Sequence, residues 1–230
     1  MTVGDDYKQV AAELADVCAA CGRDAQDVTL VAVSKTVGLE EVGQAIAAGA
    51  GDFGENRPDQ LMQKADAFPD ANWHFIGNIQ SRRIRDIVGR AVLIHSLFDE
   101  GHALKIDREA AARGICQDVL LEVNVSGEES KSGLAPDEVK SMLDACKGLQ
   151  HVRVRGLMTM APQGDLRVAQ ETFEGLKSLH GQLRAQMDDA SAELFSELSM
   201  GMTDDWREAV RAGATIVRIG RAIFNSASVR

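Results

Sequence analysis

The segment Val28–Lys35 reads VTLVAVSK, a run of apolar and β-branched side chains that ends in two polar ones. Such a run predicts a strand, because β-branched residues fit the pleated surface of a sheet. Runs of this kind recur eight times, and segments with apolar side chains three and four residues apart, typical of helices, separate them. We expect the strands at Val28–Lys35, Asp52–Glu55, Trp73–Gly77, Ala91–Ser96, Val119–Val125, Val152–Met160, Glu197–Met200 and Thr215–Ile219.

The regular alternation of strands and helices places the chain in the α/β class and indicates a parallel sheet. Eight such units in 230 residues, roughly 29 residues each, fit a compact (β/α)8 TIM barrel. A doubly wound open sheet is the alternative. We favour the barrel because the count reaches eight and because a short tail follows the last strand.

A helix is also expected before the first strand, with one apolar face formed by Val10, Leu14, Val17, Cys18 and Cys21. Its C-x-x-C pair has no second pair and no nearby histidine, so we expect both cysteines to pack rather than to bind a metal. We predict a single domain over 1–230, with the leading helix in 1–26 and the barrel in 27–225.

Composition narrows the classes of partner. Lys and Arg total 25 and Asp and Glu total 35, which gives a net charge of −10 and argues against nucleic acid as the main partner. No apolar run approaches the roughly 20 residues that a membrane helix needs, and the N-terminus lacks the features of a secretory signal. We therefore expect a cytoplasmic protein without a membrane partner. We see no exposed apolar stripe that demands a dimer, so we expect a monomer.

Polar and glycine-rich segments follow the predicted strands, where parallel α/β folds place their functional groups. Lys35 shares a strand face with Val31 and Val33 by alternation. If that face lines the barrel, desolvation at its rim frees the amine to attack a carbonyl group. The alternative is a lysine whose amine reaches into solvent at the strand end.

Two glycine-bearing segments fall on the last two strands, where TIM barrels often hold phosphate groups. The first is SMGMT at Ser199–Thr203 and the second is RIGR at Arg218–Arg221. The alternative for the first is an ordinary loop in which Thr203 caps a helix that starts near Asp204. Arg218 lies in an apolar strand and needs a partner, for which Glu122 is a candidate.

Two tempting site types are not supported. The glycine pattern at Gly49–Gly54 lies between a helix and a strand, the reverse of the order in dinucleotide-binding folds. The five histidines are scattered rather than placed at the spacing of metal ligands, and His180 continues an apolar helix stripe. We therefore expect neither a nicotinamide cofactor nor a metal, and we expect His180 to be satisfied at the edge of the core.

Seven sequence blocks occur in order between about Val28 and Phe224. They are LVAVSKT at Leu30–Thr36, FGEN at Phe53–Asn56, WHFIG at Trp73–Gly77 followed by Gln80-Ser81, NVSGEESKSG at Asn124–Gly133, GLMTM at Gly156–Met160, LSMGMT at Leu198–Thr203 and VRIGRAIF at Val217–Phe224. Together they resemble the pyridoxal phosphate homeostasis protein family. The resemblance implies a single-domain barrel, related to the N-terminal domain of alanine racemase, that binds pyridoxal 5′-phosphate (PLP).

The resemblance also implies roles for single residues. Lys35 corresponds to the lysine that forms an imine with the cofactor aldehyde, and Arg218 to the arginine that faces the pyridine nitrogen. Ser199, Gly201 and Met202 resemble a phosphate-binding loop, and Gly220 with the backbone of Arg221 resembles a second phosphate segment. Asn56 is expected near the ring, and His74 in the pocket lining. The implied cofactor-binding set is Lys35, Asn56, Ser199, Gly201, Met202, Arg218 and Gly220.

Three places depart from the family pattern. Arg57-Pro58 follows Asn56 where an aromatic and an aliphatic residue are frequent, Arg82-Arg83 stands where Asn-Lys is common, and Asn225 replaces the usual glycine. These departures concern surface contacts and the final turn, and they leave the lysine imine unaffected.

The implied function is a carrier or buffer for PLP rather than an enzyme. An arginine beside the pyridine nitrogen keeps it unprotonated, which weakens the ring as an electron sink. Racemisation also needs an acid or base on the second face of the substrate, and the one tyrosine of this chain, Tyr7, lies in the leading helix. We expect a role in intracellular PLP (vitamin B6) and amino-acid homeostasis, with PLP-dependent apo-enzymes as acceptors.

Two alternatives remain open. One is a reduced alanine-racemase-type PLP enzyme that acts on amino acids. The other is a barrel enzyme that acts on sugar phosphates without forming an imine, which requires no reactive amine at Lys35.

Overall fold

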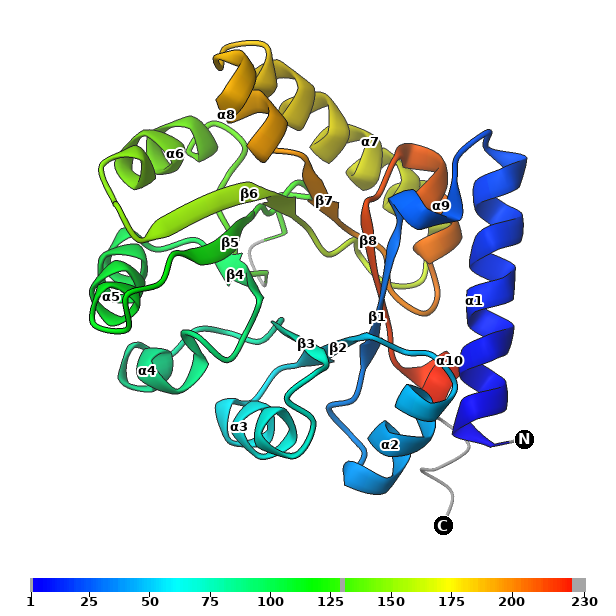
Figure 1. Cartoon of the computed structure of the whole chain (residues 1–230). Coiled ribbons are helices and arrows are strands. Elements are labelled where there is room, and N and C mark those ends of the chain that lie inside the picture. Colours follow the sequence, from blue (N-terminus) through cyan, green and yellow to red (C-terminus); the bar gives the residue numbers. More distant parts are fainter. Residues whose placement is uncertain (1, 129–130, 225–230) are drawn as a thin grey trace.

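A closed barrel of parallel strands forms the centre of the molecule (Figure 1). The computed structural model describes residues 2–128 and 131–224. Its strands are β1 (Thr29–Val33), β2 (Asp52–Glu55), β3 (Asn72–Phe75), β4 (Leu93–Leu97), β5 (Gln117–Glu122), β6 (Val152–Met158), β7 (Glu197–Ser199) and β8 (Ile216–Ile219). The barrel closes where β1 pairs with β8, with Thr29 opposite Ile216 and Ala32 opposite Ile219. The predicted TIM barrel is confirmed, and the open sheet is excluded.

Helices form a layer around this barrel (Figure 1). They are α2 (Leu39–Ala47), α3 (Pro58–Ala67), α4 (Ile84–Ile87), α5 (Glu100–Ala111), α6 (Val139–Lys147), α7 (Leu166–Arg184), α8 (Asp189–Leu194), α9 (Trp206–Ala212) and α10 (Arg221–Phe224). Two short 3₁₀ helices, η1 (Ala25–Asp27) and η2 (Ser81–Arg83), lie in the connections. The predicted alternation of strand and helix is therefore present, although α4 and α10 are single turns.

The leading helix α1 (Val3–Ala20) packs against α2, α9 and α10. It begins with a capping box, in which Thr2 Oγ1 accepts from the Asp5 amide and the Asp5 carboxylate accepts from the Thr2 amide. The prediction of an apolar face is confirmed for most of its members, since Val10, Leu14 and Cys18 are buried. It is wrong for Cys21, which is exposed because the helix ends at Ala20 and its apolar face ends with it.

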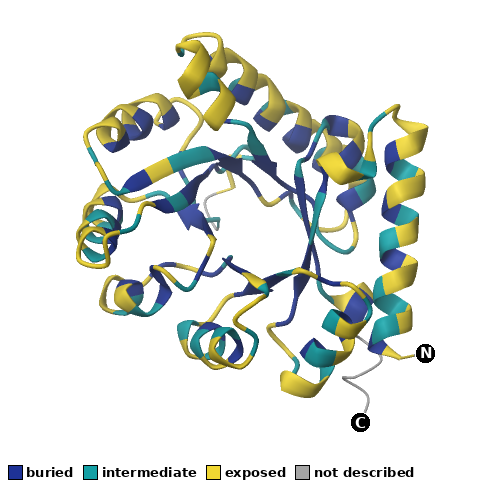
Figure 2. Ribbon diagram, in the orientation of Figure 1, coloured by how far each residue is buried: buried dark blue, intermediate teal, exposed yellow. Residues whose placement is uncertain are grey.

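Two apolar layers lie on the two sides of the barrel wall. The larger one joins the outward side chains of the strands to the helices, whose outer faces are exposed (Figure 2). The smaller one fills the barrel with Val31, Val33, Leu93, Leu120, Met158 and Ile216. Because Val31 and Val33 point inward, strand alternation directs Lys35 toward the rim of the same interior.

Membrane-spanning helices, metal-ligand clusters and disulfides are absent from residues 2–128 and 131–224. No helix there has both the length and the apolar character needed to cross a bilayer. No three His, Cys, Asp or Glu side chains are grouped so that they could hold a metal ion. The four cysteines are free thiols.

Candidate functional site

A cavity of about 900 Å³ opens at the carboxyl ends of the strands. This is the end of the barrel where TIM-barrel enzymes carry their sites. Five of the seven predicted cofactor-binding residues line it, namely Lys35, Asn56, Met202, Arg218 and Gly220. The remaining two, Ser199 and Gly201, lie directly behind this lining.

Lys35 lies at the mouth of the cavity, two residues beyond the end of β1. Its side chain is exposed, and it makes no hydrogen bond or ion pair with any residue that the structure describes. Apolar side chains of Val33, Ile76 and Met158 line the cavity beside it. The amine therefore has no hydrogen-bond or ion-pair partner among the described residues, and it lies beside an apolar part of the cavity lining. Both features suit attack on a carbonyl carbon.

A buried ion pair holds the residue that precedes Lys35. Lys64 Nζ, on α3, donates to the Ser34 carbonyl oxygen at 2.8 Å and to Glu55 Oε1 at 2.5 Å. The Ser34 hydroxyl donates to the same carboxylate oxygen at 2.6 Å. All three side chains are buried, so the main chain is clamped next to the reactive amine. Sequence reasoning missed this pair, although Glu55 ends a predicted strand within the FGEN block.

The two glycine segments of β7 and β8 lie side by side at the cavity. Arg218 N donates to the Gly201 carbonyl oxygen at 3.0 Å, and Gly220 N donates to Thr203 Oγ1 at 3.4 Å. Gly201 has a φ of +90°, and a Cβ there would lie 2.5 Å from the Ala209 Cβ. Gly201 therefore shapes the loop by letting it approach α9, and the lining is left to its neighbours.

Asp205 binds a main-chain amide of the segment Ser199–Thr203, which the sequence predicted to bind phosphate. The helix that follows the loop begins at Trp206 rather than near Asp204, and Thr203 does not cap it. Instead, Asp205 Oδ1 accepts from the Met202 amide at 2.6 Å. Burial raises the pKa of Asp205 above the ordinary value, although the Met202 amide and Arg218 oppose the shift. A carboxylate thus occupies one main-chain donor of the segment that resembles the phosphate loop.

Arg218 presents a buried guanidinium to the cavity. Its Nη1 donates to Ser199 Oγ at 2.5 Å, and its Nη2 donates to the Thr159 carbonyl oxygen at 3.0 Å. Burial lowers its pKa to about 10, so the group is still a cation at neutral pH. Glu122, the partner that the sequence suggested, makes no ion pair with Arg218. It raises the pKa of Arg218 through electrostatic attraction over a longer distance. Burial raises the pKa of Glu122.

Ser199 and His74 point into the barrel below the cavity. Ser199 Oγ contacts His95 Nδ1 at 2.8 Å, and His95 Nε2 contacts His74 Nδ1 at 2.9 Å. His74 is buried and does not line the cavity, which corrects the implied placement of that residue. Sequence reasoning missed His95, although it follows Leu93 at strand spacing and so shares the inward face of β4.

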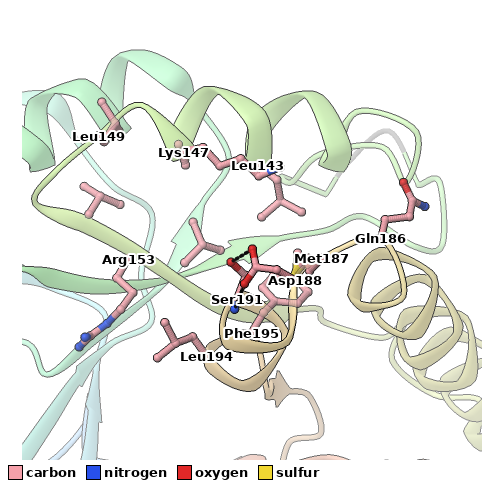
Figure 3. Close-up of a pocket in the computed structure, with 13 residues that line it drawn as sticks. Leu143, Lys147, Leu149, Arg153, Gln186, Met187, Asp188, Ser191, Leu194 and Phe195 are labelled. Atoms are coloured by element: carbon pink, nitrogen blue, oxygen red, sulfur yellow. Dashed lines mark hydrogen bonds between the residues drawn. The ribbon is translucent and has the colours of Figure 1, made fainter.

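A second hollow of about 430 Å³ lies outside the barrel between α6, β6 and α8 (Figure 3). Its two basic side chains form ion pairs with residues outside the lining. Arg153 Nε lies 2.6 Å from an Asp118 oxygen, and Lys147 Nζ lies 2.8 Å from an Asp144 oxygen. The dashed contact in Figure 3 joins Ser191 to Asp188 at the start of α8. The Cys146 thiol also lines this hollow, but burial raises its pKa to about 11, so it stays protonated and weakly nucleophilic at neutral pH. The cavity at the strand ends is therefore the candidate site.

Comparison with known proteins identifies the family. The family model for the N-terminal domain of alanine racemase matches residues 6–227. A curated relative from Pseudomonas aeruginosa, named pyridoxal phosphate homeostasis protein, is 39% identical over 98% of this chain and 96% of its own. One of the same name from Aquifex aeolicus is 36% identical over 97% of this chain and 98% of its own. The chain belongs to the pyridoxal phosphate homeostasis protein family.

Solved structures at 33–35% identity share the barrel, and so do more distant ones. PipY of Synechococcus elongatus, solved with PLP bound, is 33% identical with a TM-score of 0.80, over 92% of this chain and 99% of its own. A structure described as an unknown protein from Bifidobacterium adolescentis is 35% identical with a TM-score of 0.89, over 96% of this chain and 94% of its own. Alanine racemase from Clostridium difficile has a TM-score of 0.72 at 13% identity and shares the fold alone.

Two departures from the pattern of the pyridoxal phosphate homeostasis protein family, Arg57-Pro58 and Arg82-Arg83, are not among the residues that line the cavity. Arg57 is exposed at the start of α3, where Pro58 takes the first helical position. Arg83 donates to Asp86 at 2.6 Å on the barrel surface. Asn225 lies outside the described residues.

Proposed function

We propose that this protein binds PLP in the cavity at the strand ends and holds it as an imine of Lys35. The observation that carries the proposal is the placement of an uncommitted amine, Lys35, and a buried guanidinium, Arg218, on the lining of one cavity. PipY, which shares the barrel, is a protein whose structure has PLP bound. Formation of the imine joins the amine nitrogen to the aldehyde carbon and releases one water.

The residues present fit the three parts of PLP. Gly220 lines the cavity, and it packs so closely on β1 that a Cβ there would lie 3.1 Å from the Val33 carbonyl oxygen. Main chain without a side chain is thus part of the lining, where a backbone amide can bind an anionic group. Val33, Ile76 and Met158 provide apolar surface for a ring. Arg218 has hydrogen-bond donors and no acceptor, so a pyridine nitrogen that faces it accepts a hydrogen bond and stays unprotonated.

We propose further that the bound cofactor is stored and passed on without efficient turnover. PLP supplies an electron sink when its ring nitrogen is protonated, and a cation at Arg218 disfavours that state. The one tyrosine, Tyr7, is on α1 and does not line the cavity, so no phenol is available there for proton transfer. The exposed mouth at Lys35 and Asn56 supports exchange with acceptors, among which we place PLP-dependent apo-enzymes.

The assignment of Lys35 is tested by trapping the imine. The protein is incubated with PLP, reduced with borohydride and analysed by peptide mass spectrometry. We expect visible absorbance from the imine before reduction and the label on Lys35 after it, and we expect Lys35→Ala to abolish both. Lys140→Ala is the matched control, because Lys140 is an exposed lysine on α6 paired with Asp144. Unchanged imine absorbance in Lys35→Ala would place the imine on another amine and contradict the proposal, and unchanged PLP binding with no imine absorbance in either protein would favour a ligand held without an imine.

A reduced racemase-type enzyme is the second candidate, because the matching family model is that of the alanine racemase N-terminal domain. Incubation with PLP and each L-amino acid in deuterated water separates the two functions. We expect α-proton exchange no faster than with free PLP. Exchange well above that rate, lost in Lys35→Ala, would establish the enzyme and exclude the carrier.

A further inference from the structure

Five polar side chains form a hydrogen-bonded chain across the inside of the barrel. Asp52 Oδ1 lies 3.1 Å from His74 Nε2, and His74 Nδ1 lies 2.9 Å from His95 Nε2. His95 Nδ1 lies 2.8 Å from Ser199 Oγ, which accepts from Arg218 Nη1 at 2.5 Å. The residues come from β2, β3, β4, β7 and β8. This row of hydrogen bonds therefore connects the amino end of β2 to the cavity at the opposite end of the barrel.

The chemistry of its two ends fixes the direction of every bond. Arg218 can only donate, and the Asp52 carboxylate can only accept. With neutral rings, one arrangement satisfies all contacts: the Ser199 hydroxyl donates to His95 Nδ1, His95 Nε2–H donates to His74 Nδ1, and His74 Nε2–H donates to Asp52. The opposite tautomers would set the lone pair of His74 Nε2 against a carboxylate oxygen. In the arrangement with Nε2–H on both rings, Ser199, His95 and His74 each accept one hydrogen bond and donate one.

Burial makes this arrangement costly to break. His95 and Ser199 have no exposed surface, and His74 is 4% exposed. Burial lowers the pKa of His95 well below the ordinary value, and His74 and Arg218 lower it further, so this ring is neutral. The charged groups that act on the chain are Asp52 at one end and Arg218 at the other, and Arg218 is itself attracted by Asp205 and Glu122.

We propose that Asp52, His74 and His95 are positioning residues for Arg218. They orient the Ser199 hydroxyl so that its oxygen accepts a hydrogen bond from the Arg218 guanidinium. This hydrogen bond holds the guanidinium in place at the cavity. The partly exposed Asp52 carboxylate, 28% accessible at the amino end of β2, selects the tautomers of both rings. The expected effect of these residues on PLP affinity rests on the proposed PLP function, whereas the predicted tautomers of the two histidines are independent of it.

The tautomers are tested first, in the unaltered protein without PLP. Nitrogen-15 NMR of the histidine rings distinguishes a protonated Nδ1 from a protonated Nε2. We expect both His74 and His95 to carry a proton on Nε2 and none on Nδ1. A protonated Nδ1 on either ring would overturn the proposal. Because no ligand is needed, this result stands whether or not the protein binds PLP.

Coupling to Arg218 is tested with the variant His95→Phe, which keeps a ring and removes both hydrogen bonds. We expect the PLP dissociation constant to rise about tenfold, since a hydrogen bond that supports a buried cation is lost. In an Arg218→Met background the same change is expected to raise it less than about twofold. An equal rise in both backgrounds would show that His95 acts on folding alone and would overturn the proposal.

A matched control is available in another buried histidine. His180 is 6% exposed, stacks on Phe195 and lies outside the chain of five residues. His180→Phe is expected to leave the PLP dissociation constant unchanged. If His180→Phe weakened PLP binding as much as His95→Phe, the effect would be a general consequence of removing a buried imidazole, and the proposal would fall.

Discussion

Lys64 Nζ lies 2.5 Å from Glu55 Oε1 and 2.8 Å from the carbonyl oxygen of Ser34, the residue before Lys35. The two charged side chains are 1% and 0% exposed. Each therefore depends on the other, because an isolated charge in the interior costs several kcal/mol. The pair links α3 and β2 to the end of β1, so it supports both the fold and the placement of the amine.

Removal of this lysine should destabilise the protein strongly. We expect Lys64→Met to lower the free energy of unfolding by about 3–5 kcal/mol, since Glu55 is left buried without a counter-charge. Urea denaturation at neutral pH measures the loss. The control Lys140→Met, at an exposed ion pair, should change stability by less than about 1 kcal/mol. The double variant Lys64→Met with Glu55→Gln should recover part of the loss, and equal stability of Lys64→Met and the wild type would contradict the role of the pair.

A side chain at Gly201 should distort the loop after β7. The position combines a φ of +90° with a Cβ only 2.5 Å from the Ala209 Cβ and 2.9 Å from the Trp206 Cα. We expect Gly201→Ala to cost about 2–5 kcal/mol through backbone strain and overpacking, and to weaken PLP binding. Gly181→Ala is the control, because Gly181 is in α7 with open space around it. That change should stabilise by about 0.5–1 kcal/mol.

Neutralising Asp205 should strengthen phosphate binding. The carboxylate lines the cavity beside Met202 and repels an anion there. Asn at this position keeps an oxygen to accept from the Met202 amide, so we expect Asp205→Asn to bind PLP roughly fivefold more tightly, or about 1 kcal/mol. Isothermal titration measures the affinity, and weaker binding by the variant would mean that the carboxylate helps to hold the loop open.

The same variant should alter the pH dependence of stability. Burial raises the folded-state pKa of Asp205, so between the ordinary value of 3.8 and the raised value the folded protein holds a proton that the unfolded chain has released. Stability from this group is therefore lost as pH rises through the folded pKa. Asp205→Asn should be more stable than the wild type at pH 7, and the difference should close as pH falls below the ordinary value of 3.8. A difference independent of pH would exclude this cause.

The sequence allowed the barrel and the position of Lys35 to be predicted because both depend on local periodicity. The run from Leu30 to Val33 alternates between the two apolar layers, and Lys35, two residues beyond the end of β1, lines the cavity together with the inward Val33. Cys21 was misplaced because the helical period was extended one residue past the end of α1. Where a helix stops depends on its capping contacts, which the period does not contain.

The polar groups around the site could not be predicted in the same way. Glu55 and Lys64 meet because α3 turns one face toward β2, and the sequence does not specify that rotation. His74 and His95 meet because β3 pairs with β4 in a register that places His74 opposite Leu93. Ser199 was assigned to phosphate by resemblance, but its hydroxyl is committed to Arg218 and His95 inside the barrel. Such contacts arise from register and packing between distant segments.

Acid should destabilise the protein through His180. Its ring is buried against Phe195, Nε2 lies 3.0 Å from the Phe195 carbonyl oxygen, and burial lowers its pKa to about 4. Between the ordinary value of 6.5 and about 4 the unfolded chain binds a proton that the folded protein does not. Stability is therefore lost as pH falls through that window, by about 1.4 kcal/mol per pH unit at most.

The variant His180→Phe isolates this contribution. It lacks the titrating ring, while every other group titrates as in the wild type. We expect the variant to be less stable at pH 7, where it has lost the hydrogen bond to the Phe195 carbonyl, and the difference to shrink as pH falls toward 4. Urea denaturation of both proteins at several pH values measures it. Parallel stability curves would show that His180 is protonated equally in the folded and unfolded states, and a buried neutral ring would then be excluded.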